Sequence, residues 1–398
     1  MSVGGLSKAR LGRMREIMAG HVERGDVPGL VTLVSRRGEV HVEAFGVMAT
    51  SSNAPMRRDA IFRIASMTKP IVAAAAMILV EECKLRLDEP VDRLLPELAN
   101  RRVLKRIDAQ LDDTVPARRP LSLRDLLTFR LGFGAVMAPP GKYPIQKAIA
   151  DAGLAPSPDP TLEAPDAWMA SLGRLPLLHQ PGEGWLYHTG SDVLGVLIAR
   201  ASGGTLETFL RERLFEPLGM KDTGFHVPAD EVDRLPSAYI PNEQTGALEV
   251  HDEARGSRWT RPPVFQSGGG GLVSTVDDYL AFCQMMLNKG RHGRERILSR
   301  PSVELMTMDH LTPEQKVGAE IFFGDHLGWG FGMAVSTRRR DLISPGSFGW
   351  AGGFGTTGYS DPKEEMVGIL MTQRLMTSPK TPPVYDDFWT AAYQAIDD

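Results

Sequence analysis

A serine and a lysine stand three positions apart, at Ser66 and Lys69, directly before an unbroken apolar run at residues 71–80. Side chains three residues apart lie on one face of a helix and can reach each other. A serine hydroxyl is a weak nucleophile that needs an adjacent base. A lysine amine can be that base where burial keeps it uncharged. The pair therefore predicts a nucleophilic serine activated by a lysine.

Pro70 places this pair at the start of a helix, because its missing N–H is tolerated only in a first turn. The apolar run that follows favours a buried helix over a strand. Ser66 would then lie at the positive end of the helix, where the field disfavours a protonated Lys69. The alternative is an N-cap serine followed by a solvated lysine. A second Ser-x-x-Lys, from Ser360 to Lys363, falls in a proline-containing turn, and we interpret it as chance.

Two further segments could complete such a site. Tyr187 follows a Gly/Pro turn and precedes a helical pattern, so its phenol could project into a cleft and pass a proton to a leaving group. The alternative for Tyr187 is a core tyrosine. Residues 349–355 are rich in glycine, which lets backbone N–H groups approach a ligand closely. A strand N–H facing that of Ser66 would form a two-donor oxyanion hole, and the alternative is a bulge or a strand packed in a sheet.

The chain is long enough to hold two subdomains around these residues, because 398 residues exceed one ordinary core. Residues 29–35 and 40–45 predict a hairpin, and residues 348–359 and 366–373 predict two more strands. Helical patterns stand at both ends of the chain. The expected fold class is therefore α/β, an antiparallel sheet flanked by terminal helices and joined to a mainly helical domain.

The middle of the chain has a different pattern, with helical segments such as 121–127 and 206–215 between long Pro/Gly-rich connections. We place the α/β domain at 1–89 and 261–398, and the mainly helical domain at 90–260. Four glycines at 268–271 precede a helix at 276–287 that Ser274 or Thr275 would cap. No Gly-Lys-Ser/Thr follows these glycines, so close backbone packing explains them better than a phosphate loop.

Composition excludes several classes of protein. With 45 basic and 49 acidic residues the net charge is −4, and the densest basic cluster, Arg338 to Arg340, is typical of a solvated turn. Nucleic acid is therefore not an expected partner. Nine histidines show no His-x-x-x-His pair and no Cys/His cluster, so neither a metal nor another cofactor is expected.

The location of the protein is also indicated by composition. The N-terminus leads into an amphipathic helix without an apolar signal core, and no later segment approaches the length of a membrane span. Two cysteines, Cys83 and Cys283, are too few for a disulfide framework and indicate reduced thiols. These features predict a cytoplasmic protein without a membrane partner.

The order of these motifs resembles the serine β-lactamase and penicillin-binding-protein superfamily, whose hallmarks are Ser-x-x-Lys, then Tyr-x-Asn or Ser-x-Asn, then Lys-Thr-Gly. More narrowly, the chain is similar to the family VIII carboxylesterases, which resemble class C β-lactamases. The likeness also includes residues 85–92, 121–128, 214–220 and 267–275. It implies that Ser66 is the nucleophile, Lys69 its base and Tyr187 the group that carries the leaving-group proton. The N–H groups of Ser66 and Gly353 would form the oxyanion hole.

Two departures from the superfamily pattern bear on the substrate. Tyr187, His188 and Thr189 stand where class C β-lactamases have Tyr-x-Asn. Trp350 begins the triplet that stands where they have Lys-Thr-Gly. The lysine of that triplet helps to hold the carboxylate of β-lactams and peptides, and a neutral tryptophan cannot supply its charge. The likeness therefore favours uncharged esters over carboxylated antibiotics.

The function expected from the sequence is that of a serine carboxylesterase acting on small esters, with a short or aromatic acyl group, through an acyl-enzyme on Ser66. Candidate substrate contacts are Phe133, Tyr143, His188, Trp350 and Gly352. A structural role is the alternative for His188, and the aromatic residues are equally suited to a core. Hydrolysis of β-lactams, cleavage of peptides or amides, and acyl transfer to an alcohol remain open on the same fold. A non-catalytic binding protein is the alternative of a different class.

Overall fold

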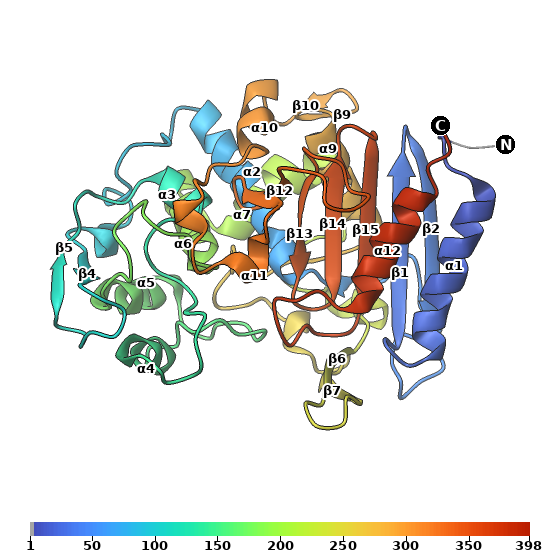
Figure 1. Cartoon of the computed structure of the whole chain (residues 1–398), viewed down its shortest axis with the longest axis horizontal. Coiled ribbons are helices and arrows are strands. Elements are labelled where there is room, and N and C mark those ends of the chain that lie inside the picture. The colour runs from blue at the N-terminus through green and yellow to red at the C-terminus, as the bar shows by residue number, and fades with distance from the viewer. Residues whose placement is uncertain (1–3) are drawn as a thin grey trace.

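The computed structural model describes residues 4–398 and is built on a seven-stranded antiparallel sheet with helices on both faces (Figure 1). The strand order is β11-β12-β13-β14-β15-β1-β2, so the N-terminal hairpin extends a sheet made by the C-terminal strands. The strands are β1 (Gly29–Arg36), β2 (Glu39–Gly46), β11 (Leu327–Trp329), β12 (Ala334–Ser336), β13 (Phe348–Gly352), β14 (Thr356–Asp361) and β15 (Met366–Thr372). The fold class expected from the sequence is confirmed.

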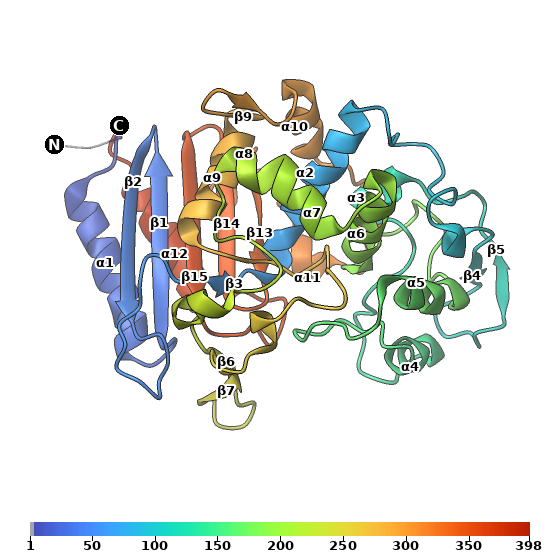
Figure 2. The same ribbon diagram turned by 180° about the vertical axis from the view of Figure 1, so that it is seen from behind.

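Strand β1 is buried on both faces, and its side chains alternate between two cores. Val31 and Leu33 join the main core, whereas Leu30 and Val34 pack under the terminal helices. Those helices are α1 (Lys8–Glu23) and α12 (Pro383–Gln394), which lie side by side over one face of the sheet (Figure 1). On the other face lie α9 (Val276–Leu287) and α2 (Thr68–Glu81), seen from behind in Figure 2. A strand covered on both faces favours apolar side chains, which explains the run from Leu30 to Val34, interrupted only by Thr32.

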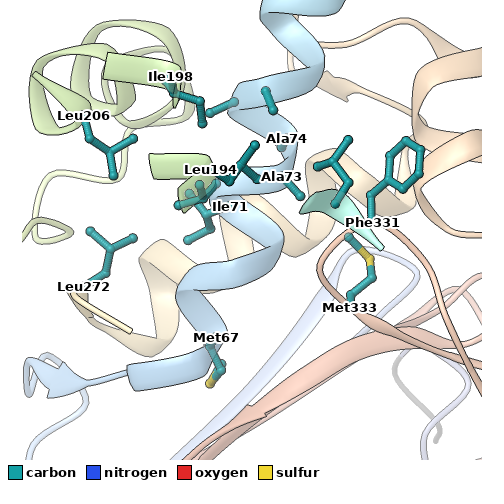
Figure 3. Close-up of a cluster of buried hydrophobic side chains, with 14 of the residues drawn as sticks. Met67, Ile71, Ala73, Ala74, Leu194, Ile198, Leu206, Leu272, Phe331 and Met333 are labelled. Atoms are coloured by element: carbon teal, nitrogen blue, oxygen red, sulfur yellow. The ribbon is translucent and has the colours of Figure 1, made fainter. Parts of the chain in front are cut away.

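Helix α2 is the centre of the main core, and residues 68–79 are all buried. Figure 3 shows Ile71, Ala73 and Ala74 between two sets of neighbours. Leu194 and Ile198 belong to α6 (Thr189–Ser202), and Phe331 and Met333 lie on the opposite side. The burial of this helix fixes the position of the residues at its N-terminus.

The remaining elements are short. The helices are α3 (Leu123–Leu127), α4 (Pro144–Asp151), α5 (Pro165–Arg174), α7 (Leu206–Leu210), α8 (Glu216–Leu218), α10 (Arg300–Met306) and α11 (Glu320–Phe323). The two-stranded pairs are β3 (Phe62–Arg63) with β8 (Val273–Ser274), β4 (Arg102–Leu104) with β5 (Thr114–Pro116), β6 (Ala238–Pro241) with β7 (Leu248–Asp252), and β9 (Arg291–His292) with β10 (Glu295–Arg296). The domain boundaries at 89/90 and 260/261 stay a prediction.

One predicted strand is wrong. Residues 348–359 form two antiparallel strands, β13 and β14, joined by a tight turn in which Gly355 has a φ of +93°. The glycines that suggested a ligand-binding strand also make the turn, because glycine adopts such a φ without steric cost. The helix predicted at 206–215 is α-helical only as far as Leu210, and residues Arg211–Phe215 form a π-helical turn directly after it. The hairpin at the N-terminus, the helix at 276–287 and its Thr275 cap are confirmed.

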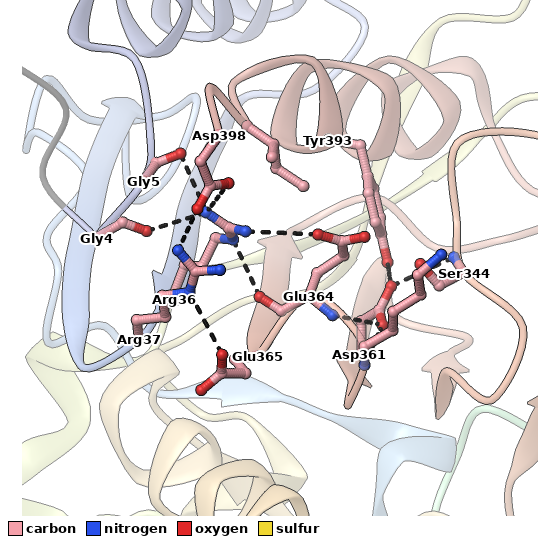
Figure 4. A network of polar contacts seen from close by, with 12 residues as sticks. Gly4, Gly5, Arg36, Arg37, Ser344, Asp361, Glu364, Glu365, Tyr393 and Asp398 are labelled. Carbon is pink, nitrogen blue, oxygen red and sulfur yellow. Dashed lines mark hydrogen bonds and ion pairs between the residues drawn. The ribbon is translucent and has the colours of Figure 1, made fainter.

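The two ends of the described chain meet around Arg36, a buried guanidinium on β1 (Figure 4). It donates to the carbonyl oxygens of Gly4 and Gly5 at 3.2 and 3.1 Å, and pairs with the Asp398 carboxylate at 2.8 Å. Its Nε donates to the carbonyl oxygen of Glu364 at 3.0 Å. A buried arginine is tolerated because its donors are satisfied.

Among residues 4–398, no single helix has both the length and the apolar composition needed to cross a membrane. Helix α6 and the segment Leu206–Leu218 meet that test only together, as a pair bent by 79°. Within the same residues, no group of three or more His, Cys, Asp or Glu side chains is placed to hold a metal ion. Cys83 and Cys283 are free thiols, the first exposed and the second buried.

Candidate active site

Ser66 lies at the entrance to α2, in a single 3-10 turn formed by Ala65–Met67. The residue before it, Ala65, has a φ of +45°. Residues other than glycine rarely adopt that conformation, so backbone strain is stored directly beside the hydroxyl. Pro70 occupies the first turn of α2, as predicted from its missing N–H.

The hydroxyl of Ser66 contacts two functional side chains. The Nζ atom of Lys69 lies 2.8 Å from the Oγ atom of Ser66, and the phenolic oxygen of Tyr187 lies 2.8 Å from the same atom. Lys69 comes from the first turn of α2, and Tyr187 from the segment that leads into α6. Because α2 and α6 pack against each other in the main core, the three groups are held together although Tyr187 and Ser66 are 121 positions apart.

Trp350 of β13 fixes the phenol of Tyr187. Its indole Nε1 donates a hydrogen bond of 2.8 Å to the phenolic oxygen. An indole N–H can only donate, so Tyr187 accepts from Trp350 and donates its own proton to Ser66. The Tyr187 ring stacks on Phe322 of α11 with centroids 5.1 Å apart, and Trp329 holds Trp350 edge-on at 4.8 Å.

The amine of Lys69 is buried, with 1% of the residue exposed, and its second partner is the carbonyl oxygen of Gly269. That loop is held by Asp192 of α6, which accepts from the N–H of Gly269 at 3.0 Å and from the hydroxyl of Ser267 at 2.6 Å. Burial raises the pKa of Asp192, although the hydrogen bond from Ser267 opposes that shift. The backbone of Gly269 therefore links a buried carboxyl group to the lysine, because its N–H bonds to Asp192 and its carbonyl oxygen to Lys69.

Gly353 lies in the turn that follows β13 and lines the same cleft as Ser66. The hairpin is held against the Ser66 turn by the hydroxyl of Thr356, which donates to the carbonyl oxygen of Ile64 at 3.2 Å. Within residues 4–398, neither the N–H of Ser66 nor that of Gly353 donates to a protein acceptor. Both residues line the cleft, so these two N–H groups are the candidate donors to an oxygen atom of a ligand.

The family model described as Beta-lactamase matches residues 14–385. The chain belongs to the beta-lactamase family. Protein Rv1367c of Mycobacterium tuberculosis is 39% identical over 362 residues, which cover 88% of this chain and 87% of that protein. Esterase EstB of Burkholderia gladioli is 31% identical over 365 residues, 86% of this chain and 85% of the esterase. The solved structure of EstCE1, a hydrolase with promiscuous acyltransferase activity, matches with a TM-score of 0.79 at 24% identity and covers 98% of this chain and 99% of that one.

The family match and the likeness to EstB place the chain in the serine β-lactamase and penicillin-binding-protein superfamily, near the family VIII esterases. It is an enzyme of the serine hydrolase and acyl-transfer type. The fold that these proteins share is the arrangement described above, a large antiparallel sheet with helices on both faces.

Ser66, Tyr187, Trp350 and Gly353 line one cleft with a volume of about 1140 Å³. Phe133 and Tyr143, predicted as substrate contacts, do not line it among the described residues. Phe133 is fully buried in the main core. The side chain of Tyr143, at the start of α4, packs partly against the same core. Aromatic residues occur both in cores and in ligand clefts, so the residue type alone could not show that Phe133 and Tyr143 belong to the core.

Gly352 and His188 stand beside the cleft without lining it. A Cβ atom on Gly352 would collide with the carbonyl oxygen of Ile64 and the hydroxyl of Thr356, so this glycine allows β13 to approach the Ser66 turn. The His188 ring lies behind the site, with Nδ1 3.7 Å from the Asp192 carboxylate. Burial, with a smaller effect of the Lys69 charge, lowers the pKa of His188 to about 3. This histidine is therefore neutral near pH 7, and its position supports the structural alternative.

Two residues of this site were not identified from the sequence. Asp192 had one available signal, a lone carboxylate at the start of the apolar segment 193–199. A charged group entering a buried helix must have partners, and those partners proved to be Ser267 and Gly269. Phe322 lies in a helix of only four residues and had no local signal. The predicted packing role of the glycines at 268–271 is supported, because a Cβ atom on Gly268 would meet the backbone of α6.

Proposed function

We propose that this chain is a serine carboxylesterase that hydrolyses uncharged esters through an acyl-enzyme on Ser66. The observation that supports it is the position of one hydroxyl oxygen 2.8 Å from both a buried amine and a phenol. A nucleophile within hydrogen-bond reach of its base is the geometry that acyl transfer requires. The esterase activity in the name of EstB, which is 31% identical, agrees with this assignment.

In the first half of the reaction, Oγ of Ser66 forms a bond to the ester carbonyl carbon as its proton passes to the uncharged amine of Lys69. The negative charge that develops on the carbonyl oxygen is stabilised by the N–H groups of Ser66 and Gly353. The bond to the alcohol then breaks, and the departing oxygen takes the proton of Tyr187. The ammonium of Lys69, 4.7 Å from the centre of the phenol ring, returns a proton to that site.

The second half of the reaction hydrolyses the acyl-enzyme. A water molecule gives one proton to the Tyr187 and Lys69 pair as its oxygen bonds to the acyl carbon. The acyl carbon then separates from Oγ of Ser66, which takes that proton back. The products are the carboxylic acid, the alcohol and the free enzyme, so the atoms balance.

The substrate class follows from the charge at the site. Trp350 occupies the place of a lysine that binds carboxylates in relatives, and it supplies a neutral N–H instead. A carboxylate beside this indole would be buried without a counter-charge, which is costly. We therefore expect small aryl esters to be turned over far faster than β-lactams, which carry a carboxylate.

The test is hydrolysis of p-nitrophenyl acetate and butyrate beside the β-lactam nitrocefin, in wild type and Ser66→Ala. We expect the ester activity to disappear in Ser66→Ala while the circular dichroism spectrum and melting temperature are retained. A fluorophosphonate probe should label wild type and leave Ser66→Ala unlabelled. Retained ester turnover in Ser66→Ala would overturn the assignment. Nitrocefin turnover equal to that of the esters would favour the β-lactamase alternative.

Acyl transfer is the second candidate, because it uses the same acyl-enzyme with an alcohol in place of water. Its test adds an acceptor alcohol to the ester assay and measures the transferred ester by mass spectrometry. Transfer that outpaces hydrolysis at millimolar acceptor would make it the main activity. Amide and peptide cleavage is tested by p-nitroanilide substrates, which we expect to be poor because no asparagine stands in the position two residues after Tyr187.

A further inference from the structure

The cleft at Ser66 is far larger than a small ester requires. Its volume of about 1140 Å³ exceeds the range of about 300–1,000 Å³ that is typical of pockets for drug-sized ligands. From Ser66 and Trp350 it extends to the segment 376–381 and to the side chains of Tyr385 and Trp389 on α12. An acetyl or butyryl group would leave most of this space filled with water.

Exposed apolar side chains converge on this cleft from separate parts of the chain. Met137, Ile321 and Leu342 are 48%, 53% and 44% exposed, and all three line it. They come from the loop before α4, from α11 and from the loop after β12. Large apolar side chains on a surface are ordinarily scattered singly, so three of them lining one cleft indicate a binding region. Phe322 and Trp389 extend the same apolar wall.

The charges at the rim of the cleft do not favour one sign. Arg340 and Lys380 line it together with Asp341 and Asp386. Arg338, which also lines it, is paired with Asp325. A cleft that selected an anion would carry a surplus of unpaired cations. The neutral indole of Trp350 at the inner end agrees with an uncharged ligand.

We propose that the substrate is an uncharged ester in which one side, acyl or alcohol, is a large apolar group that occupies the cleft beyond Trp350. This inference rests on the proposed esterase function. The large group displaces water from the side chains of Met137, Ile321 and Leu342, and the apolar area that is buried supplies the preference. The ester carbonyl remains at Ser66, between the two backbone donors.

The experiment compares two matched pairs of substrates. For a large acyl group, p-nitrophenyl 1-naphthylacetate is compared with p-nitrophenyl acetate. For a large alcohol, 2-decalyl acetate is compared with ethyl acetate. In at least one pair we expect kcat/KM of the large ester to exceed that of the small ester tenfold or more. The pair that shows this ratio identifies which side of the ester the cleft holds.

Two variants assign that ratio to the cleft. Ile321→Asp places a charge in the apolar wall and should lower the ratio of large to small ester at least fivefold. Val317→Asp is the control, because Val317 is 74% exposed and does not line the cleft among the described residues. A wild-type ratio below ten in both pairs overturns the proposal. The proposal is also overturned if Ile321→Asp lowers the ratio of large to small ester no more than the control Val317→Asp does.

Failure of the proposed function is distinguished by p-nitrophenyl acetate, which must be hydrolysed by wild type and not by Ser66→Ala. If that assay fails, the cleft is tested by titrating Ser66→Ala with both pairs of esters and measuring tryptophan fluorescence. Tenfold tighter binding of the large ester in either pair supports the large apolar ligand, and equal or weaker binding in both pairs rejects it.

Discussion

The indole Nε1 of Trp350 donates a 2.8 Å hydrogen bond to the phenolic oxygen of Tyr187. The likeness to class C β-lactamases implies a lysine at this position in those proteins, so the chain would have a neutral donor where they have a cationic one. In the proposed mechanism Tyr187 gives up its proton, and the indole would then stabilise negative charge on the phenolic oxygen without attracting an anionic substrate. A hydrogen bond to a charged group contributes about 1.5–3 kcal/mol.

Trp350→Phe should therefore lower kcat/KM for p-nitrophenyl butyrate about tenfold or more. The ring that packs on Trp329 is kept, so the melting temperature should change little. Trp329→Phe is the matched control, because the Nε1 of Trp329 is buried without an acceptor among the described residues and takes part in no hydrogen bond to the site. Equal losses in the two variants would show that ring packing, and not the N–H, supports the reaction.

Asp192 holds the N–H of Gly269, whose carbonyl oxygen accepts from the Lys69 amine, so we expect Asp192 to act as a positioning residue for Lys69. Asp192→Ala would leave the N–H of Gly269 and the hydroxyl of Ser267 without an acceptor, and a displaced amine costs up to about 100-fold in rate. We expect kcat to fall more than tenfold, with the labelling rate of Ser66 by a fluorophosphonate falling in parallel. Asp192→Asn keeps one carbonyl oxygen and should recover most of the loss.

Ser267→Ala is the control for this prediction, because it removes one donor and leaves the bond between Asp192 and Gly269 in place. Its kcat should stay within a few-fold of wild type. If Asp192→Asn lost as much activity as Asp192→Ala, the negative charge of Asp192 would matter and not its role as an acceptor.

The sequence was sufficient for features that depend on local pattern. The spacing of Ser66 and Lys69, with Pro70 after them, predicted two side chains on one face at the start of a buried helix, and the structure places them there. Strand β1 was predicted as a strand of a hairpin from two β-rich runs joined by the short segment 36–39, which contains Gly38. These features are set by interactions within a few residues or by a periodicity of the chain.

The sequence was insufficient where a contact joins distant segments. The hydrogen bond from Trp350 to Tyr187 spans 163 positions, and nothing in either segment marks the other as its partner. Phe133 was a candidate for the cleft because aromatic residues suit both a cleft and a core, and only the fold placed it in the core. The turn between β13 and β14 was missed because its glycines also fitted a ligand-binding strand.

Asp278 on α9 should make stability depend on pH, because burial raises its pKa from 3.8 to about 6. Below pH 3.8 the Asp278 carboxyl is protonated in both the folded and the unfolded protein. Between pH 3.8 and about 6 it ionises in the unfolded protein and stays largely protonated in the folded protein, so the folded state binds more protons. Stability should therefore fall as pH rises through this window, by at most about 3 kcal/mol from this group. Asp278→Asn cannot ionise and keeps an oxygen for the N–H of Asp222 and the hydroxyl of Thr223.

The measurement for Asp278 is urea unfolding of wild type and Asp278→Asn at pH 4.5, 5.5 and 7. The free energy of unfolding of Asp278→Asn should increase relative to that of wild type as pH rises. Parallel curves for the two proteins across this range would contradict a raised pKa for Asp278.

The adjacent arginines at the end of β1 allow a comparison of buried and exposed charge. The Arg36 side chain is 2% exposed, and it contacts the carbonyl oxygens of Gly4, Gly5 and Glu364 as well as Asp398. The Arg37 side chain is 44% exposed and pairs with Asp398 and Glu365 at the surface. Arg36→Leu removes the donors of a buried network, whereas Arg37→Leu removes ion pairs that water and salt already screen.

Arg36→Leu should lower the free energy of unfolding by about 2–3 kcal/mol, because the partly buried carbonyl oxygens of Gly4, Gly5 and Glu364 lose a charged donor. Arg37→Leu should leave the urea midpoint close to that of wild type at 0.15 M salt. Both variants should retain kcat at 25 °C, because neither arginine lines the cleft among the described residues. Equal destabilisation by the two substitutions would mean that the surface pair with Asp398, and not the buried guanidinium, holds the chain ends on the sheet. In that case raising the salt concentration should destabilise wild type and leave Arg37→Leu unaffected.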